Sequence, residues 1–294
     1  MKKSKFPYLV LAPILILLTL FVVVPIIGSF AIAFFDYNPL RSSGGGNRFV
    51  GFQNFAMLFK NGLFTTTLWN TLYYVFVMVG INLVMTLAIA QVLCSLNSNK
   101  WRSLFRVNFF MPCVAPLAAV AIVWQRTILN TKGGALNMLL GFFGIAPINW
   151  LNVGMLMPSL IILSLWADVG YNIILFIAGI QGIPEDYCEA AQIDGTNAIQ
   201  RFFHITLPLL SRTLAFVVAM TFISQFQAFA QFSIIAGEGG GPGRAGYVLS
   251  TYIYDIGFKI KDMGYASAVS LALFALIMIV TLAQRRIGRV DWGY

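Results

Sequence analysis

Ionisable side chains are scarce in this chain. Only 10% of its 294 residues are charged, with 10 acidic residues, one histidine and three cysteines. A lone histidine, His204, and three scattered cysteines offer none of the ligand spacings of a metal site. Cys94, Cys113 and Cys188 lie in predicted membrane spans or on the predicted cytoplasmic side, so no disulfide is expected. We therefore expect neither a metal nor another cofactor bound by this chain.

Long runs of apolar residues dominate the sequence. Apolar residues make up 59% of the chain, and a helix needs about 20 of them in succession to cross a bilayer core. We predict an all-α polytopic membrane protein with one transmembrane domain over residues 1–294. The predicted spans cover residues 8–35, 68–93, 107–123, 156–180, 214–236 and 265–282.

The first apolar run has a second interpretation. It follows Lys2, Lys3 and Lys5, as the apolar region of a cleavable signal peptide does, and Ala31-Ile32-Ala33 resembles a cleavage site. The run is much longer than the 7–15 apolar residues of a signal peptide, which favours a retained span.

The net charge of +9 is informative about topology. With both termini in the cytoplasm, eleven lysines and arginines lie inside and eight outside, and the inner loops are also shorter. The excess of positive charge on the inner side favours this orientation. No nucleic-acid-binding motif accompanies the charge, so it indicates contact with anionic lipid and not with nucleic acid.

A polar island at residues 181–211 interrupts the apolar runs. Pro184 suits the first turn of a helix, and Glu185 and Asp186 complement the positive helix end. Gly195 predicts the end of that helix, because glycine accepts the left-handed conformation. A second turn from Asn197 to His204 then leads to Pro208 at the start of the next span. The sequence predicts a bent, exposed helix pair with small residues on one face.

The island also carries a spaced motif. Glu189-Ala190-Ala191 is followed after three residues by Gly195, and after nine more by Ile205, one residue, Leu207 and Pro208. This pattern resembles the cytoplasmic docking loop of ABC-importer permeases, which seats in the ATPase subunit. The resemblance implies an ATPase-coupling role for eight residues: Glu189, Ala190, Ala191, Asp194, Gly195, Ile205, Leu207 and Pro208.

The resemblance covers nearly the whole chain and indicates the carbohydrate, maltose-transporter type. The segments that carry it are 49–52, Trp166 with Gly170-Tyr171, 240–242 and 264–268. It implies the first of two permease subunits, in a bacterial cytoplasmic membrane. The implied partners are a second permease, two ATP-binding subunits and an extracytoplasmic sugar-binding protein, with ATP hydrolysis in a partner chain.

The fourth predicted span contains an acidic residue, Asp168. An ionisable side chain there costs roughly 2.5–3.5 kcal/mol on insertion scales, so it normally faces an aqueous cavity or a partner. Asp168 shares a helical face with Ser164, Tyr171 and Asn172, and Trp166 lies near it in the sequence. Aromatic faces with carboxylates and amides suit a sugar. The alternative is an Asp168 bonded to the second permease.

The fifth predicted span offers a second polar face, formed by Thr221, Ser224, Gln225 and Ala228. The resemblance implies that these positions and Ala230 line a central sugar site. Gln227 and Gln231 lie on another face, where polar side chains can equally bind the partner permease. No lysine or arginine falls within a span, which favours a neutral saccharide, and an oligosaccharide is the predicted substrate.

Two other classes of protein remain as alternatives. A membrane enzyme could hold a cation and diphosphate through Asp186, Glu189 and Asp194, but these acids form no paired aspartate-rich repeat. A secondary transporter could use Asp168 as its proton carrier, but no internal repeat is evident. On the outer side, residues 135–143 show helical spacing of apolar residues and predict a short amphipathic helix.

Overall fold

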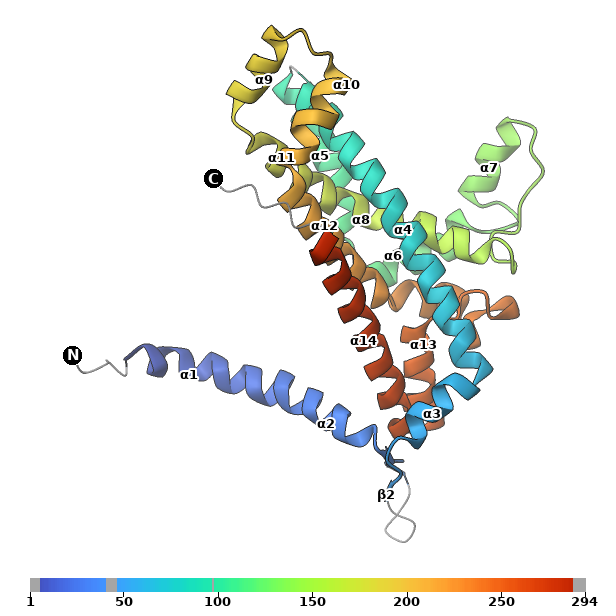
Figure 1. Cartoon of the computed structure of the whole chain (residues 1–294). Coiled ribbons are helices and arrows are strands. Elements are labelled where there is room, and N and C mark those ends of the chain that lie inside the picture. Colours follow the sequence, from blue (N-terminus) through green and yellow to red (C-terminus); the bar gives the residue numbers. More distant parts are fainter. Residues whose placement is uncertain (1–5, 41–46, 97, 288–294) are drawn as a thin grey trace. The chain divides into compact units, whose positions relative to one another are not determined.

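The computed structural model describes residues 6–40, 47–96 and 98–287, and within them it is built almost entirely of helices (Figure 1). The chain divides into two compact units. One contains Met1–Thr66 and Tyr252–Ala275, and the other contains Thr67–Thr251 and Leu276–Tyr294. Each unit is described by itself.

The first unit begins with an apolar helix that runs through α1 (Phe6–Leu18), the π-turn η1 (Thr19–Val23) and α2 (Val24–Ile32). Two short antiparallel strands follow, β1 (Phe35–Asp36) and β2 (Arg48–Phe49), and then α3 (Gln53–Lys60). The buried Asn54 joins them, because its Nδ2 donates to the carbonyl oxygens of Ala33 at 2.8 Å and Phe35 at 3.0 Å. The π-turn η7 (Asp255–Ile260) and the start of α14 (Met263–Ile287) also belong to this unit.

The second unit contains most of the remaining helical residues, while the first turn of α4 and the end of α13 belong to the first unit. The longer helices are α4 (Gly62–Ser95), α5 (Asn99–Val114), α8 (Leu156–Gln181) and α12 (Ser211–Phe226). The shorter ones are α6 (Leu117–Val123) with η2 (Trp124–Ile128), α7 (Ala135–Phe142), α9 (Glu185–Ile193), α10 (Ala198–Arg201), η3 (Phe202–Thr206), α11 (Leu207–Leu209), η4 (Phe232–Ala236), η5 (Glu238–Gly240), η6 (Pro242–Arg244) and α13 (Leu249–Tyr254).

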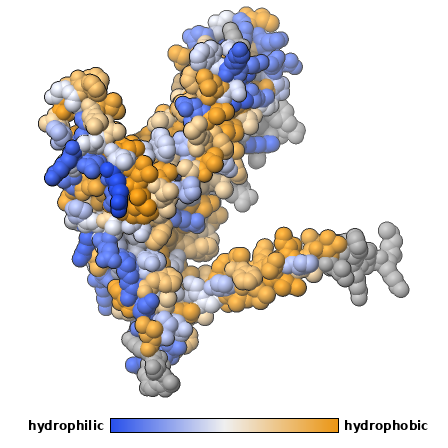
Figure 2. All heavy atoms as spheres, turned by 180° about the vertical axis from the view of Figure 1, so that it is seen from behind, coloured by the Kyte–Doolittle hydropathy of each residue, from blue (hydrophilic) through white to orange (hydrophobic). Residues whose placement is uncertain are grey.

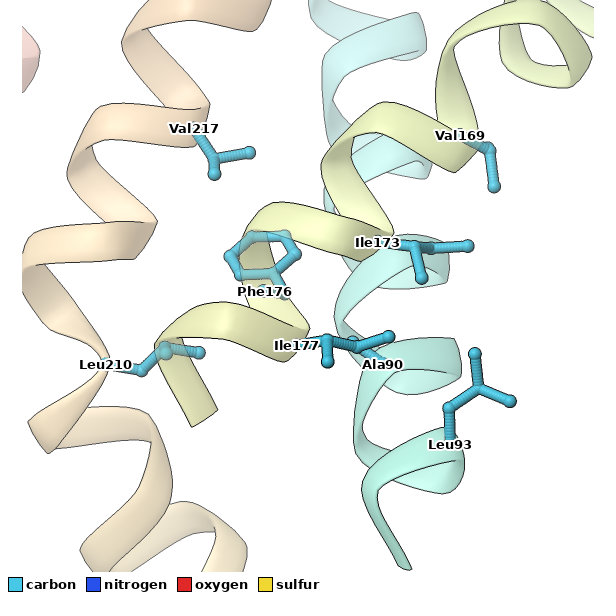
Figure 3. Close-up of a cluster of buried hydrophobic side chains, with 8 residues drawn as sticks. All are labelled: Ala90, Leu93, Val169, Ile173, Phe176, Ile177, Leu210 and Val217. Atoms are coloured by element: carbon cyan, nitrogen blue, oxygen red, sulfur yellow. The ribbon is translucent and has the colours of Figure 1, made fainter. Parts of the chain in front are cut away.

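Helix α8 is the most deeply buried of the candidate membrane spans. Its Ile173, Phe176 and Ile177 pack against Ala90 and Leu93 of α4, and Figure 3 shows these side chains together with Leu210 and Val217 from the α12 side. Burial of such side chains stabilises a fold through close packing. The cluster therefore holds α4, α8 and α12 together at one end of the unit.

Close approach of α5 to α8 depends on a glycine. A Cβ added to Gly170 would lie 2.0 Å from the backbone oxygen of Phe109, so a larger residue at position 170 would force the two helices apart. The two helices are in extensive contact. Gly170 thus fixes how near the α5 backbone comes to α8.

The span predictions are confirmed in part. Four helices are long and apolar enough to cross a membrane, and up to six if each bent pair is one span, within the part of the chain that the structure describes. The third predicted span, 107–123, contains a bend of 93° between α5 and α6. Pro112 and Pro116 flank this break, and neither can donate a helical hydrogen bond. The fifth span is also interrupted, since α12 ends at Phe226.

The predicted outer amphipathic helix at 135–143 is present as α7. Its buried Asn137 organises the surrounding loop, because Asn137 Oδ1 accepts from the backbone N–H of Ile148 at 3.0 Å and from Trp150 Nε1 at 2.9 Å. A glycine-rich turn lies at residues 239–242, with positive φ at Gly239, Gly240 and Gly241.

Replacement of Gly170 by alanine should destabilise the protein. The new methyl group would overlap the Phe109 carbonyl, and overpacking of this kind typically costs about 1–3 kcal/mol. We expect a thermal unfolding midpoint several degrees below that of the wild type in detergent, measured by scanning calorimetry. Gly80→Ala is the matched control, because nothing lies within 4 Å of the added Cβ. Equal midpoints for the two variants would contradict the close-contact account.

Candidate functional site

The polar island forms a compact cap at one end of the second unit, where Figure 1 shows α9, α10 and α11 next to one another. Helix α9 begins at Glu185 directly after Pro184, as predicted, with Glu185 and Asp186 in its first turn. Gly195 adopts a φ of +76° just beyond the helix end. The predicted stop at this glycine is therefore confirmed, and its conformation is one that a side chain would strain.

The second turn of the island is held by a capping box at Asn197. Asn197 Oδ1 accepts from the Gln200 backbone N–H at 2.8 Å, and Gln200 Oε1 accepts from the Asn197 N–H at 3.0 Å. Such reciprocal caps satisfy two orphan helix donors. The helix that begins here continues through η3 to α11, which has Pro208 in its first turn. The expected helix–glycine–helix arrangement is thus present in the structure.

The exposed surface of the island mixes acidic and apolar side chains. Glu189, Ala190 and Asp194 are exposed, and Ile193 is 86% exposed. Figure 2 shows hydrophilic side chains gathered over the α9–α10 end. A shallow pocket of about 470 Å³ lies in this surface. It is lined by Asp186, Tyr187, Ala190, Ala191, Asp194, Thr196 and Ile205.

Within the predicted motif, Ala191 differs from its neighbours because it is buried. Its carbonyl oxygen accepts from the Thr196 hydroxyl at 2.6 Å, which ties the end of α9 to the turn after Gly195. Ala191 therefore helps to shape the island, and Glu189 and Ala190 form its accessible face. Leu207 and Pro208 are half-buried at the base.

A second site lies between α5, α8 and α12. It is a cavity of about 390 Å³, and six of the residues that the sequence assigned to a substrate pathway line it. These six are Asp168, Tyr171, Asn172, Thr221, Ser224 and Gln225. The α5–α6 break opens onto the same cavity, since Pro112, Cys113, Ala115 and Leu117 also line it.

Asp168 is the one acidic residue that lines this cavity. Its Oδ2 accepts a hydrogen bond from Gln225 Nε2 at 2.7 Å, so α8 and α12 are joined across the cavity wall. The lining includes no lysine or arginine. The carboxylate therefore stands among neutral donors and acceptors, an arrangement that suits hydroxyl groups more than anions.

The orientation of Gln225 is set by a buried tyrosine on α4. Gln225 Oε1 lies 2.6 Å from Tyr74 Oη and can only accept, so the single phenol hydrogen is donated to it. Ser164 Oγ lies 2.8 Å from the same phenol oxygen and can donate its hydroxyl hydrogen to it. Because the Oε1 end of Gln225 faces Tyr74, its Nε2 end faces Asp168.

Gln231 completes this network from the other side of the break after α12. Its Nε2 donates to Tyr74 Oη at 3.3 Å and lies 3.4 Å from Ser164 Oγ. The prediction that Gln231 can bind the partner permease is therefore wrong, because the Gln231 side chain is buried inside this chain. Gln227, by contrast, is exposed.

A second polar network joins the same three long helices. Asn172 Nδ2 of α8 lies 2.6 Å from Asn82 Oδ1 of α4 and 3.1 Å from Thr221 Oγ1 of α12. Polar side chains that bond between apolar helices contribute on average about 0.6 kcal/mol each in membranes. Asn172 therefore has a structural contact as well as its place in the cavity wall.

Two residues of the predicted pathway lie elsewhere. Trp166 lines a separate apolar cavity of about 610 Å³ and packs against Trp124, with ring centroids 5.6 Å apart. Positions 166 and 168 are roughly 200° apart on a helix, so they cannot share a face. Ala228 was predicted to share a helical face with Thr221. It does not, because α12 ends at Phe226 and Ala228 lies beyond the helix.

The contribution of α4 to these two hydrogen-bond networks was not predicted from the sequence. Tyr74 and Asn82 are buried and supply the third side of both networks. The signal was present, because polar residues recur at helical spacing along this apolar helix and mark one face. These are Thr67, Thr71, Tyr74, Asn82 and Thr86, and all are buried.

Residues 89–289 match the family model described as "Binding-protein-dependent transport system inner membrane component". The chain belongs to this family, whose members are the non-catalytic permease components of ABC importers, with the ATPase in a partner subunit.

Individual relatives are similar over nearly their full length. The arabinooligosaccharides transport system permease protein AraP of Bacillus subtilis is 33% identical over 97% of this chain and 89% of its own. The trehalose/maltose transport system permease protein MalF of Thermococcus litoralis is 28% identical over 98% and 95%. A chain of a crystallised bacterial alginate ABC transporter has the same fold, with a TM-score of 0.83 at 22% identity, covering 97% of this chain and 94% of that one.

The Tyr74 hydroxyl should stabilise the network measurably. Tyr74→Phe leaves the buried Gln225 oxygen without its donor, and an unsatisfied buried polar group costs about 1–3 kcal/mol. We expect a lower thermal unfolding midpoint for Tyr74→Phe and an unchanged one for Tyr73→Phe, whose ring is exposed on the same helix. Identical effects of the two substitutions would show that the hydroxyl does not hold the network.

Proposed function

We propose that this chain is a translocation subunit of an ATP-driven oligosaccharide importer, and that its cavity between α5, α8 and α12 is part of the sugar pathway. The observation that carries the proposal is the cavity lining, where one carboxylate, two amides, hydroxyls and the half-exposed Tyr171 converge without any cation. Sugar recognition uses these groups, because carboxylates and amides pair with hydroxyls and an aromatic face packs on C–H groups.

The names of the relatives support a carbohydrate and an oligosaccharide in particular. AraP is named for arabinooligosaccharides and MalF for trehalose and maltose. Another relative, from Agrobacterium fabrum, is named for sulfoquinovosyl glycerol and is 31% identical. An anionic ligand of that kind would lack a counter-ion in the cavity of this chain, so we propose a neutral sugar.

The chain acts with partners in this proposal. It pairs with a second permease, of which it is the first-type, MalF-like subunit, and it receives sugar from an extracytoplasmic binding protein. One of the two ATP-binding subunits docks on the island at 181–211, through Glu189, Ala190, Asp194 and Ile205. Both termini lie in the cytoplasm, which places the island on the side where ATP is available. The exposed acids beside a shallow pocket support this docking, since carboxylates can pair with basic side chains of a partner.

Reversal of the charge at Glu189 should uncouple the importer. Glu189→Lys replaces an exposed acceptor by a cation, so we expect the permease to remain in the membrane while sugar-dependent ATP hydrolysis falls at least about tenfold, as loss of a charge-assisted contact predicts. The measurement is ATPase activity of the reconstituted importer. Glu238→Lys makes the same charge change at an exposed residue outside the island and should retain activity. Full sugar-dependent hydrolysis in Glu189→Lys would exclude a docking role for this residue.

Removal of the charge at Asp168 should weaken sugar binding. Asp168→Asn keeps the shape of the side chain but loses a charged acceptor, worth about 1.5–3 kcal/mol in a hydrogen bond. We expect the half-saturating sugar concentration for uptake to rise roughly tenfold to a hundredfold and basal ATP hydrolysis to stay unchanged.

A panel of neutral oligosaccharides, delivered with the cognate binding protein, identifies the sugar for that experiment. Glu238→Gln is the control for loss of an acidic charge outside the cavity. An unchanged half-saturating concentration in Asp168→Asn would place Asp168 outside the sugar pathway and favour the alternative in which it bonds to the second permease.

A further inference from the structure

Two arginines at the start of α5 have nitrogens that no neighbour satisfies. Arg102 donates from Nη2 to the backbone oxygens of Leu96 at 2.6 Å and Cys94 at 3.3 Å, which closes the end of α4. The Nε of Arg102, and the Nε and Nη2 of Arg106, are buried without a hydrogen-bond partner among the residues described. A buried guanidinium without an acceptor is costly. These three nitrogens are covered by the chain itself, but both side chains as a whole are only half-buried, so the remainder of each side chain is accessible to an anion from outside the chain.

An apolar groove lies directly beside these arginines. It has a volume of about 360 Å³ and is formed between α4 and α5 by apolar side chains, among them Ala88, Val92, Leu96 and Phe105. Leu96 connects the two features, because its side chain lines the groove and its carbonyl accepts from Arg102.

Helical spacing makes the arginines and the groove one continuous surface. Arg102, Phe105, Arg106 and Phe109 are separated by three, one and three residues, so they form a single stripe along α5. Phe105 and Phe109 line the groove. A ligand that contacts both the arginines and the apolar groove must therefore be anionic at one end and apolar at the other.

The surroundings resemble a membrane–water interface. Trp101 is 57% exposed and its ring packs beside Phe105, with centroids 6.0 Å apart, while Lys100 is also exposed. Tryptophan and basic residues gather at the interface of membrane proteins. The sequence from Asn99 to Phe110 contains no acidic residue, so nothing in this segment competes for an anion.

We propose that this surface is a binding site for one anionic phospholipid. The headgroup phosphate accepts from Arg106 and Arg102, and one acyl chain lies in the groove between α4 and α5. An acidic segment of a partner protein would satisfy the arginines, but it would leave the apolar groove beside them unexplained. A zwitterionic lipid carries its own cation and gains less from the two arginines. The site is separate from the sugar cavity and from the island.

The test uses the complete importer in nanodiscs with a photoreactive acyl chain on the probe lipid. We expect a phosphatidylglycerol probe to label the peptides that contain residues 88–109 about thirtyfold more than a phosphatidylcholine probe with the same chain, given about 1 kcal/mol for each of the two arginines near a lipid surface. This comparison is made on the wild-type protein and needs no variant to fold.

Two variants separate the headgroup contact from the groove. Arg106→Gln should abolish the preference for phosphatidylglycerol, while Arg126→Gln, which removes an exposed arginine elsewhere, should leave it intact. Ala88→Trp fills the groove from an exposed position and should lower labelling by both probes.

Three results would overturn the proposal. The first is equal labelling by the two probes, which indicates ordinary contact with bulk lipid. The second is a headgroup preference that persists in Arg106→Gln. The third is absence of lipid labelling together with a cross-link from a photoreactive residue at position 105 to another subunit, which assigns the stripe to a subunit contact.

Discussion

The hydrogen bond between Tyr74 and Gln225 is the interaction on which the candidate sugar site depends. Three apolar helices can slide or rotate against one another with little cost, because their packing is similar in neighbouring registers. A buried amide removes that freedom, since both of its ends need partners in defined directions. With Oε1 on Tyr74 and Nε2 on Asp168, Gln225 fixes α12 against α4 and α8 at once.

Breaks in the helices make room for the site that these bonds define. The bend after Val114 turns α6 away from α5, and the end of α12 at Phe226 lets the chain return through Gln231 to the same tyrosine. Irregular backbone within a membrane protein is tolerated where it is buried in protein or lines a water-filled cavity. The α5–α6 break lines the cavity, and this agrees with the cavity being part of an aqueous pathway.

Local features of the chain were predictable, and contacts between distant segments were less so. Pro184, Gly195 and Asn197 act on their own neighbours, so the bounds of the island followed from their backbone preferences. Asp168 and Gln225 could be selected because polar residues in apolar spans need a partner. Their pairing with each other required the relative register of α8 and α12. The partner of Tyr74 likewise depends on which helices the polar face of α4 meets, and the sequence alone does not show that. Trp166 and Ala228 lie outside the cavity lining for different reasons, because Trp166 is on another face of α8 and Ala228 lies beyond the end of α12.

The central claim is that the cavity beside Asp168 belongs to a pathway of alternating access. Cys113 lines that cavity, so its reaction with a membrane-impermeant thiol reagent reports access directly in an importer where Cys94 and Cys188 are serine. The account predicts that Cys113 reacts from one side of the membrane without nucleotide and from the other side, or at a rate about tenfold different, when the ATPase is trapped with ATP and vanadate. The same rate and the same side in both states would contradict it.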